Sequence, residues 1–196
     1  RDQYDEVWHG ARQVGSAFKP FTLVAAFEHG FPAGKVYSSK SPQCNLPGWI
    51  SASGCVSNAE GAGDGGYIDL WEATRDSVNV VFAQLALDVG PENIVDAAHE
   101  MGITAGLDPV PSITLGTEEV PTMDMASAYA TLAAGGIYSE PTAIRKVVLP
   151  NGKEDTKAGW GSPKRKRVIP DGVAWKVTQI LEDNVSYGTG TAAGFG

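Results

Sequence analysis

The chain has 196 residues, of which 42% are hydrophobic and 19% are charged, a composition typical of a globular domain and not of a disordered chain. Its 15 Lys and Arg residues against 23 Asp and Glu residues give a net charge of −8, which argues against broad nucleic-acid binding, because that requires a basic face. The longest apolar runs, such as residues 21–27, are much too short to span a membrane.

The N-terminal part of the chain is predicted to form one helix followed by a long loop. Residues 16–29 place apolar side chains on one stripe and end at Gly30, which indicates a helix. Residues 31–66 carry repeated Gly and Pro turn signals and are expected to be mostly loop.

Both cysteines, Cys44 and Cys55, lie in this loop. An even number of cysteines in one short loop favours a disulfide in an oxidising compartment. The alternative is two free thiols in a cytosolic protein. A metal site is not expected, because the spacing is not C-x-x-C and no His lies nearby.

The middle of the chain is predicted to be helical. Asp69, with Glu72 three residues later, is typical of a helix N-terminus. Two helices with a break between them are expected within residues 69–90, and further helices within residues 92–134, where Pro and Gly mark the ends.

The C-terminal part is predicted to form a β-hairpin and a last helix. The hairpin is expected within residues 142–169, with strands at 142–149 and 164–169 joined by a P-N-G turn. The basic run inside the second of these strands is interpreted as a solvated edge strand and not as a nucleic-acid site. A helix over residues 172–185 follows.

Ser16 and Lys19 are the first candidate pair for chemistry. They lie three residues apart at a helix start and so share a face. A serine hydroxyl attacks only when a base takes its proton, and a lysine can be that base if its surroundings lower its pKa. Taken alone, the pattern also fits an N-capping Ser beside a solvated Lys.

Ser77 and Asn79 form the second pair, at the predicted break between two helices. A hydroxyl and an amide two residues apart can both face one cleft, where the hydroxyl relays a proton and the amide binds a carbonyl or an N–H group. The alternative is a pair that only caps the helix junction.

Together, the two pairs resemble the S-x-x-K and S-x-N motifs of the penicillin-interacting serine enzymes. Residues 12–21 are similar to the nucleophile segment of penicillin-binding proteins, and residues 115–130 to a segment typical of their class A, bifunctional members. Residues 135–138 with Pro141, and residues 188–190, are similar to later segments in the expected order. The chain therefore resembles the transpeptidase domain of a class A penicillin-binding protein.

This resemblance implies an α/β (α+β) penicillin-binding transpeptidase or serine β-lactamase-like fold. The third motif of the family, Lys-Thr/Ser-Gly, is not found: in residues 187–191 no Lys precedes the Thr-Gly. Residues 1–196 are therefore expected to form a partial domain, mostly its helical part and a small β-hairpin, with the central sheet strands largely outside the segment.

The resemblance also implies roles for the four residues. Ser16 would be the acylated nucleophile, with its backbone N–H as half of the oxyanion hole, and Lys19 would be the general base. Ser77 would pass a proton to the leaving amine, and Asn79 would bind the peptide stem or the side-chain amide of a β-lactam. No cofactor and no metal are expected.

The implied activity is that of a peptidoglycan D,D-transpeptidase, inhibited covalently by β-lactams, at the extracytoplasmic face of the bacterial cell membrane. Its partners would be peptidoglycan stem peptides, with a membrane anchor and a glycosyltransferase domain upstream; the isolated segment is expected to be incomplete for activity. The alternatives are a non-catalytic penicillin-binding or sensing domain and a serine β-lactamase. The β-lactamase would need a further Glu, and no E-x-x-L-N-like segment follows Asn79.

Overall fold

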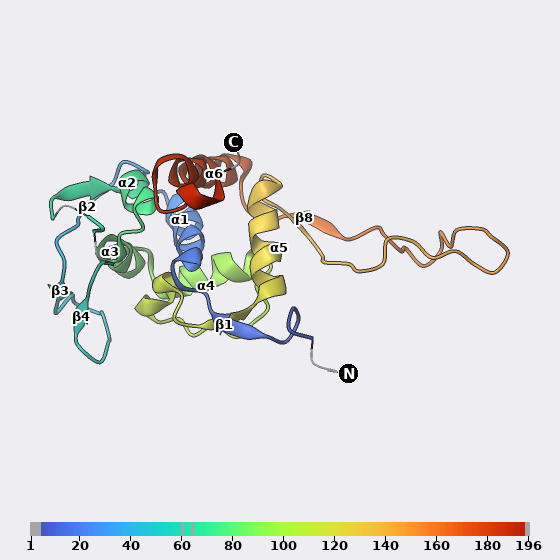
Figure 1. Cartoon of the computed structure of the whole chain (residues 1–196), viewed down its shortest axis with the longest axis horizontal. Helices are drawn as coiled ribbons and strands as arrows, with labels where there is room; N and C mark the ends of the chain where they lie inside the picture. Colours follow the sequence, from blue (N-terminus) through green and yellow to red (C-terminus); the bar gives the residue numbers. More distant parts are fainter. Residues whose placement is uncertain (1–4, 60, 64, 195–196) are drawn as a thin grey trace.

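Helices form the body of the molecule in the computed structural model, which describes residues 5–59, 61–63 and 65–194 (Figure 1). The α-helices are α1 (Lys19–Glu28), α2 (Leu70–Arg75), α3 (Asn79–Val89), α4 (Pro91–Glu100), α5 (Thr122–Ala133) and α6 (Asp171–Tyr187). The 3-10 turns are η1 (Gly15–Phe18), η2 (Pro111–Leu115) and η3 (Thr191–Ala193).

The centre of the fold is α1. Residues 19–26 are all buried, because α3, α4 and α6 pack around this helix. The sequence predicted a single apolar stripe over residues 16–29, whereas the structure buries the helix on every side, as befits a helix in the middle of a core. Its first predicted turn is the 3-10 turn η1. The largest fully buried side chains around it include Phe18, Phe21, Phe82, Leu85, Ile94 and Met101.

Local signals account for several helix ends. The Asp69 carboxylate accepts a hydrogen bond of 2.9 Å from the backbone N–H of Glu72, which caps α2. Gly90, with φ of 92°, ends α3, and Pro91 at once begins α4. None of the described helices is both long enough and apolar enough to cross a bilayer.

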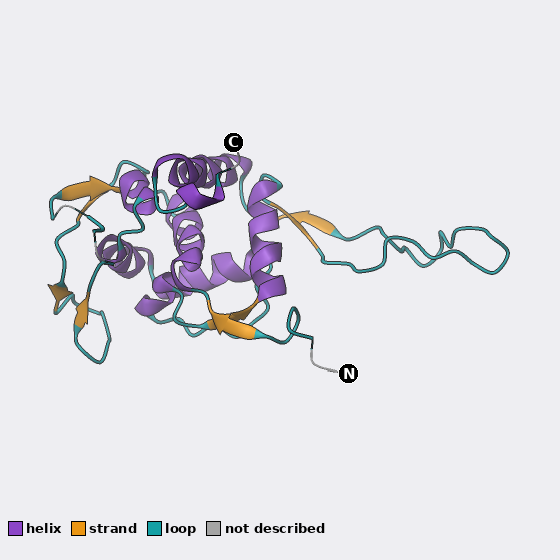
Figure 2. Ribbon diagram, in the orientation of Figure 1, coloured by secondary structure: helices purple, strands orange, loops and turns teal. Residues whose placement is uncertain are grey.

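The strands form small antiparallel pairs at the edges of this helical body (Figure 2). The pairs are β1 (Ala11–Gln13) with β6 (Glu119–Pro121), β2 (Val36–Ser38) with β5 (Tyr67–Asp69), β3 (Gln43–Cys44) with β4 (Cys55–Val56), and β7 (Ile137–Ser139) with β8 (Arg165–Arg167). Among the described residues every sheet is two-stranded, so helix packing, and not a sheet, provides the core.

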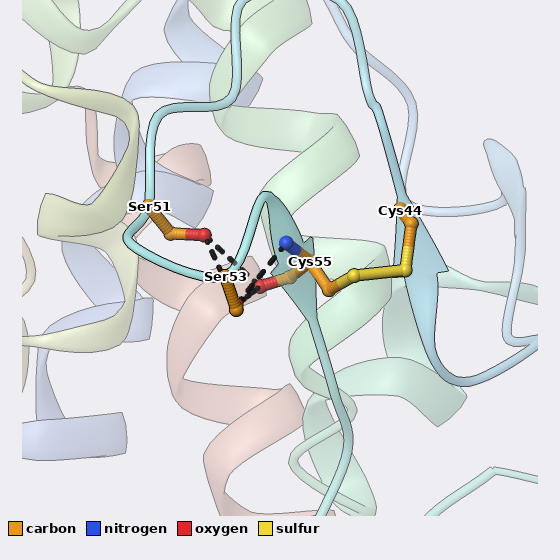
Figure 3. Close-up of a disulfide and its surroundings, with 4 residues drawn as sticks. All are labelled: Cys44, Ser51, Ser53 and Cys55. Carbon is orange, nitrogen blue, oxygen red and sulfur yellow. Dashed lines mark hydrogen bonds between the residues drawn. A yellow bond between two sulfur atoms is a disulfide. The ribbon is translucent and has the colours of Figure 1, made fainter.

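The predicted disulfide is present and joins β3 to β4 (Figure 3). Cys44 and Cys55 are direct register partners in this antiparallel pair. The hydroxyls of Ser51 and Ser53 each donate a hydrogen bond of 3.2 Å to the carbonyl oxygen of Cys55. The loop over residues 31–66 is therefore folded back on itself and fixed by a covalent bond.

The predicted strand over residues 142–149 is wrong. The partner of β8 is β7, which begins at Ile137, and the predicted segment contributes only the single bridge between Val148 and Glu154 beside the turn. Residues 140–164, called the arm below, project from the helical body, and none of their side chains is buried (Figure 1). A segment with β-forming residues makes a stable strand only when one of its faces packs on another surface, and no such surface lies against residues 142–149.

Candidate active site

Ser16 lies in the 3-10 turn η1, just before α1, and is exposed. Its hydroxyl makes no hydrogen bond with any residue that the structure describes, so it does not act as a helix cap. The turn itself is held from two sides. The backbone N–H of Gly15 donates to the carbonyl of Gly116 over 3.1 Å, and the Tyr129 hydroxyl donates to the carbonyl of Ala17 over 2.9 Å.

Gly116 allows its segment to pack closely against the turn that holds Ser16. A Cβ atom at this position would lie 2.1 Å from the carbonyl oxygen of Gly15, and the φ of Gly116 is 67°. Both the space and the backbone conformation therefore require glycine. The segment around residue 116 is part of residues 115–130, which resemble the family; it supports the serine turn and does not itself supply a reactive group.

Lys19 follows Ser16 by one turn, but its side chain points into the protein and is 2% exposed. Its Nζ donates hydrogen bonds to the carbonyl oxygen of Ser77 over 2.7 Å, to Ser77 Oγ over 2.9 Å and to Asn79 Oδ1 over 2.8 Å. Burial lowers the pKa of Lys19 to about 7, because the charged form loses its hydration. A solvated lysine is thus excluded at this position.

Ser77 lies at the junction of α2 and α3 with a positive φ of 55°, a conformation that costs free energy for a residue with a side chain. The backbone N–H groups of Ser77 and Val78 donate to the carbonyls of Thr74 and Ala73, over 3.1 and 2.8 Å. The junction is therefore a fixed turn that aims the Ser77 hydroxyl at Lys19.

Asn79 is the first residue of α3 and connects Lys19 to the loop over residues 31–66, which contains the disulfide. Its Oδ1 accepts from Lys19, and its Nδ2 donates to the carbonyl of Ser57 over 3.0 Å. Next to it, the backbone N–H of Val80 donates to Asn58 Oδ1 over 3.0 Å. The loop thereby orients the Asn79 amide, with the oxygen toward the lysine.

The four predicted residues lie around two adjoining pockets. One, of about 210 Å³, is lined by Ser16, Lys19 and Ser77 among others. The second, of about 390 Å³, is lined by Ser16, Ser77 and Asn79. Thr189 is part of the wall of both. An exposed hydroxyl, a buried amine with a pKa near neutrality and a second hydroxyl are the groups that acyl transfer to serine needs.

Sequence patterns did not single out three further residues of these walls as chemical candidates, namely Tyr129, Asn184 and Thr189. Thr189 lies in the Gly-Thr-Gly segment and Tyr129 in residues 115–130, but nothing local marks Asn184. A larger cavity of about 530 Å³, between the end of α5 and the start of α6, has no serine–lysine pair in its wall. No group of three or more His, Cys, Asp or Glu side chains suited to a metal occurs in the described part of the chain.

Comparisons with known proteins identify the family of the chain. A family model described as "Penicillin binding protein transpeptidase domain" matches residues 4–195. Penicillin-binding protein 1A of Mycobacterium tuberculosis is 36% identical over 194 residues, which cover 91% of this chain and 23% of that protein. The chain thus spans about a quarter of the length of this relative.

Solved structures give the same result. The PonA1 protein from Mycobacterium tuberculosis, in complex with penicillin V, superposes with a TM-score of 0.80 at 34% identity, over 95% of this chain and 50% of that chain. The D,D-transpeptidase domain of a peptidoglycan glycosyltransferase from Eggerthella lenta superposes with a TM-score of 0.82 at 23% identity, over 98% of this chain and 53% of that chain. The second comparison supports the fold alone.

Proposed function

The chain belongs to the penicillin-binding protein transpeptidase family and has its fold, and on this premise we propose that Ser16 is the nucleophile of a peptidoglycan D,D-transpeptidase. The observation that carries the proposal is the buried Lys19, which is hydrogen-bonded to Ser77 and Asn79 and lines the same pocket as the exposed Ser16. The activity belongs to the complete protein that contains this chain.

The proposed reaction begins with neutral Lys19. Ser16 Oγ attacks the carbonyl carbon of the penultimate D-Ala of a stem peptide, and its proton passes to Lys19. The backbone N–H of Ser16 stabilises the developing oxyanion. The C–N bond then breaks, Ser77 passes the proton from Lys19 to the leaving D-Ala amine, and an acyl-enzyme remains. The amine of a neighbouring stem attacks this ester, which forms the cross-link and releases Ser16 with its proton.

The partners of Lys19 suit both of its charge states. The carbonyl oxygen of Ser77 and Asn79 Oδ1 can only accept, whereas the Ser77 hydroxyl can either accept or donate. Charged Lys19 donates to all three atoms. Neutral Lys19 keeps its two N–H groups on the two acceptors, and its lone pair can accept a proton that comes from Ser16 or from Ser77. A proton can therefore move between Lys19 and Ser77 without leaving a buried polar group unpaired.

Intact-mass analysis of the complete protein, incubated with a fluorescent penicillin, tests the proposal. We expect one covalent adduct on the wild type and none on Ser16→Ala. Ser162→Ala, an exposed serine of the arm, is the matched control and retains the adduct. A wild type without an adduct, or an adduct that survives Ser16→Ala, contradicts the assignment of Ser16.

The same experiment separates the alternatives. An adduct that disappears within minutes favours a serine β-lactamase. A stable adduct, without cross-linked product from a D-Ala-D-Ala donor and an amine acceptor, favours a penicillin-binding or sensing domain. We place the protein at the extracytoplasmic face of the bacterial cell membrane because peptidoglycan lies there, and fractionation of cells with an antibody tests this placement.

A further inference from the structure

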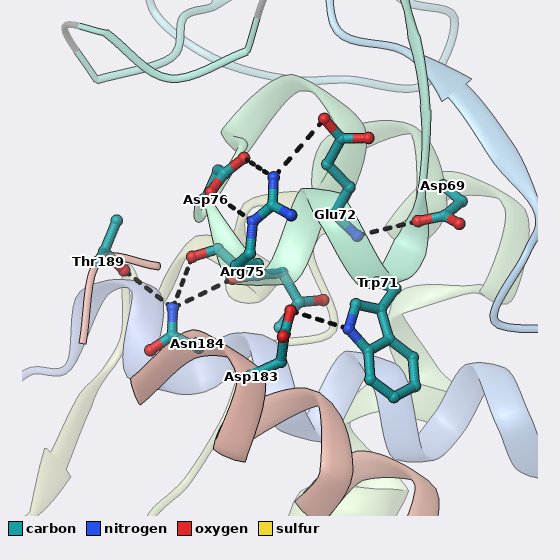
Figure 4. Close-up of polar contacts among 9 residues, drawn as sticks. Asp69, Trp71, Glu72, Arg75, Asp76, Asp183, Asn184 and Thr189 are labelled. Atoms are coloured by element: carbon teal, nitrogen blue, oxygen red, sulfur yellow. Dashed lines mark hydrogen bonds and ion pairs between the residues drawn. The ribbon is translucent and has the colours of Figure 1, made fainter. Parts of the chain in front are cut away.

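The turn at residues 188–190 docks on the C-terminus of α2, which lies more than a hundred residues earlier in the chain. The backbone N–H of Thr189 donates to the carbonyl of Arg75 over 3.2 Å. Asn184 Nδ2, on α6, donates to the same carbonyl over 2.7 Å and to Thr189 Oγ1 over 3.0 Å (Figure 4). One amide side chain therefore holds both the end of α2 and the turn.

The two glycines of the turn allow this close docking. A Cβ atom on Gly188 would lie 2.1 Å from the carbonyl oxygen of Arg75, and one on Gly190 would lie 2.4 Å from Asn184 Oδ1. Both have negative φ values, −109° and −89°, so the backbone conformation alone does not require glycine. At Gly188 a backbone carbonyl leaves no space for a Cβ atom, whereas at Gly190 a Cβ atom would displace the Asn184 side chain. Thr189 is the residue between them that can present a side chain.

The docked turn is next to the candidate active site. Arg75 lies two residues before Ser77, so the turn rests on the helix end that leads into the Ser77 junction. Thr189 lines both pockets together with Ser16 and Ser77, and Asn184 lines the smaller one.

The hydrogen bonds around Thr189 leave its hydroxyl proton without an acceptor among the described residues. Each proton of the Asn184 amide has a partner, the carbonyl of Arg75 and Thr189 Oγ1. Because Thr189 Oγ1 accepts that bond, its own proton points elsewhere, and it has no acceptor among the described residues. Exposed in the pocket wall, this proton can bond to an oxygen of a bound molecule.

We propose that Thr189 contacts the acyl donor, its hydroxyl donating a hydrogen bond to a carbonyl or carboxylate oxygen of the peptide or β-lactam, and that Asn184 is the residue that positions it. This inference rests on the proposed function. Thr189 Oγ1 must therefore be both present and correctly aimed for fast acylation of Ser16.

The test measures the kinetics of acylation of the complete protein by a fluorescent penicillin, separated into the limiting rate constant and the half-saturating concentration. Asn184→Asp keeps the shape but replaces the donor by an oxygen, and Thr189→Val removes the hydroxyl. We expect each variant to lower the ratio of the limiting rate constant to the half-saturating concentration about tenfold or more. A small misplacement of a group in an active site has effects of this size. Thr189→Ser keeps a hydroxyl, so its ratio should lie within about twofold of that of the wild type.

Trp71→Phe is the matched control. It removes the hydrogen bond of 2.9 Å between Trp71 Nε1 and Asp183, which joins the same two helices without touching the turn (Figure 4). We expect this variant to lose thermal stability but to be acylated at the wild-type rate. The double variant Asn184→Asp with Thr189→Val should be no slower than Thr189→Val alone, because the two residues act as one unit.

The outcomes distinguish the two levels of the proposal. If the wild type forms no adduct, the proposed function fails. If the wild type is acylated and Thr189→Val reacts equally fast, the contact with the acyl donor is refuted. If Thr189→Val is slow but Asn184→Asp reacts like Trp71→Phe, the positioning role of Asn184 is refuted.

Discussion

Burial controls the charge of Lys19 and therefore the pH at which the site can work. Because burial lowers the pKa of Lys19 to about 7, the amine is mostly neutral above that pH and mostly protonated below it. Protonated Lys19 cannot accept the Ser16 proton. We expect the acylation rate constant to rise with pH, with an apparent pKa near 7. Stopped-flow measurements with fluorescent penicillin between about pH 5 and pH 9 span both charge states.

Lys19→Arg is the control for this pH dependence. A guanidinium stays charged throughout the range, so this variant should be acylated very slowly at every pH. Circular dichroism checks that it is folded. A flat profile for the wild type would show that Lys19 is not the titrating base.

Ser77 combines a strained backbone with a reactive side chain, and two substitutions separate these properties. Ser77→Gly and Ser77→Ala both remove the hydroxyl, so both should slow acylation by about a hundredfold, a typical effect of losing one proton-transfer group. At a φ of 55°, alanine retains the strain and glycine relieves it. The glycine variant should therefore be more stable than the alanine variant by about 1 kcal/mol in urea unfolding. Equal stability of the two would refute the strain at Ser77.

At the level of elements, the disulfide between β3 and β4 stabilises the loop that orients Asn79. The bond closes a loop with a sequence separation of 11 residues, and removing it should lower the free energy of unfolding by about 2–3 kcal/mol through the entropy of the unfolded chain. Urea titration of the wild type with and without reductant measures this difference. The variant Cys44→Ser with Cys55→Ser should unfold at the lower midpoint in both conditions. No change on reduction would contradict the stabilising role.

Elements marked by their own residues could be predicted from the sequence. Asp69 with Glu72, and Gly90 with Pro91, specify helix ends through contacts only a few residues apart. The sequence alone could not reject the predicted strand over residues 142–149. Whether this segment forms a strand depends on whether another surface packs against it, and only the whole fold determines that.

The same distinction applies to the candidate site. Ser16 with Lys19, and Ser77 with Asn79, are short spacings that a motif can express, although only folding brings the two pairs together. Asn184 has no motif, since its partner Arg75 is 109 positions away in the sequence. A residue that acts by fixing another segment leaves no local pattern, so it emerges only from the three-dimensional contacts.

For the molecule as a whole, charge and burial are divided between the helical body and the arm. Eight of the 15 Lys and Arg residues lie between residues 145 and 167, with only two of the 23 Asp and Glu residues. None of these eight cations forms a salt bridge with a described residue. The net charge of −8 is therefore the sum of +6 over residues 145–167, which form most of the arm together with β8, and −14 over the rest of the chain.

Since residues 140–164 bury no side chain, the stability of the body should not depend on the arm. Glu140 and Lys164 are joined by a backbone hydrogen bond of 3.1 Å, so residues 141–163 can be replaced by an Asn-Gly turn that keeps β7 and β8 paired. We expect the melting temperature to change by less than about 3 °C, a shift of roughly 1 kcal/mol. The penicillin acylation rate should also be unchanged, because the arm has no residue in the pockets around Ser16.

Ile169→Ala provides the contrast to this deletion. Ile169 follows β8 but is 1% exposed and packs against Gly136, so its truncation should cost about 2–5 kcal/mol. If removal of the arm destabilised the protein as much as Ile169→Ala, the arm would have to pack on the body, contrary to its exposure. If it slowed acylation without loss of stability, the arm would contribute to binding of the acyl donor. The expected result, a stable and reactive protein without the arm, assigns the fold and the chemistry to the helical body.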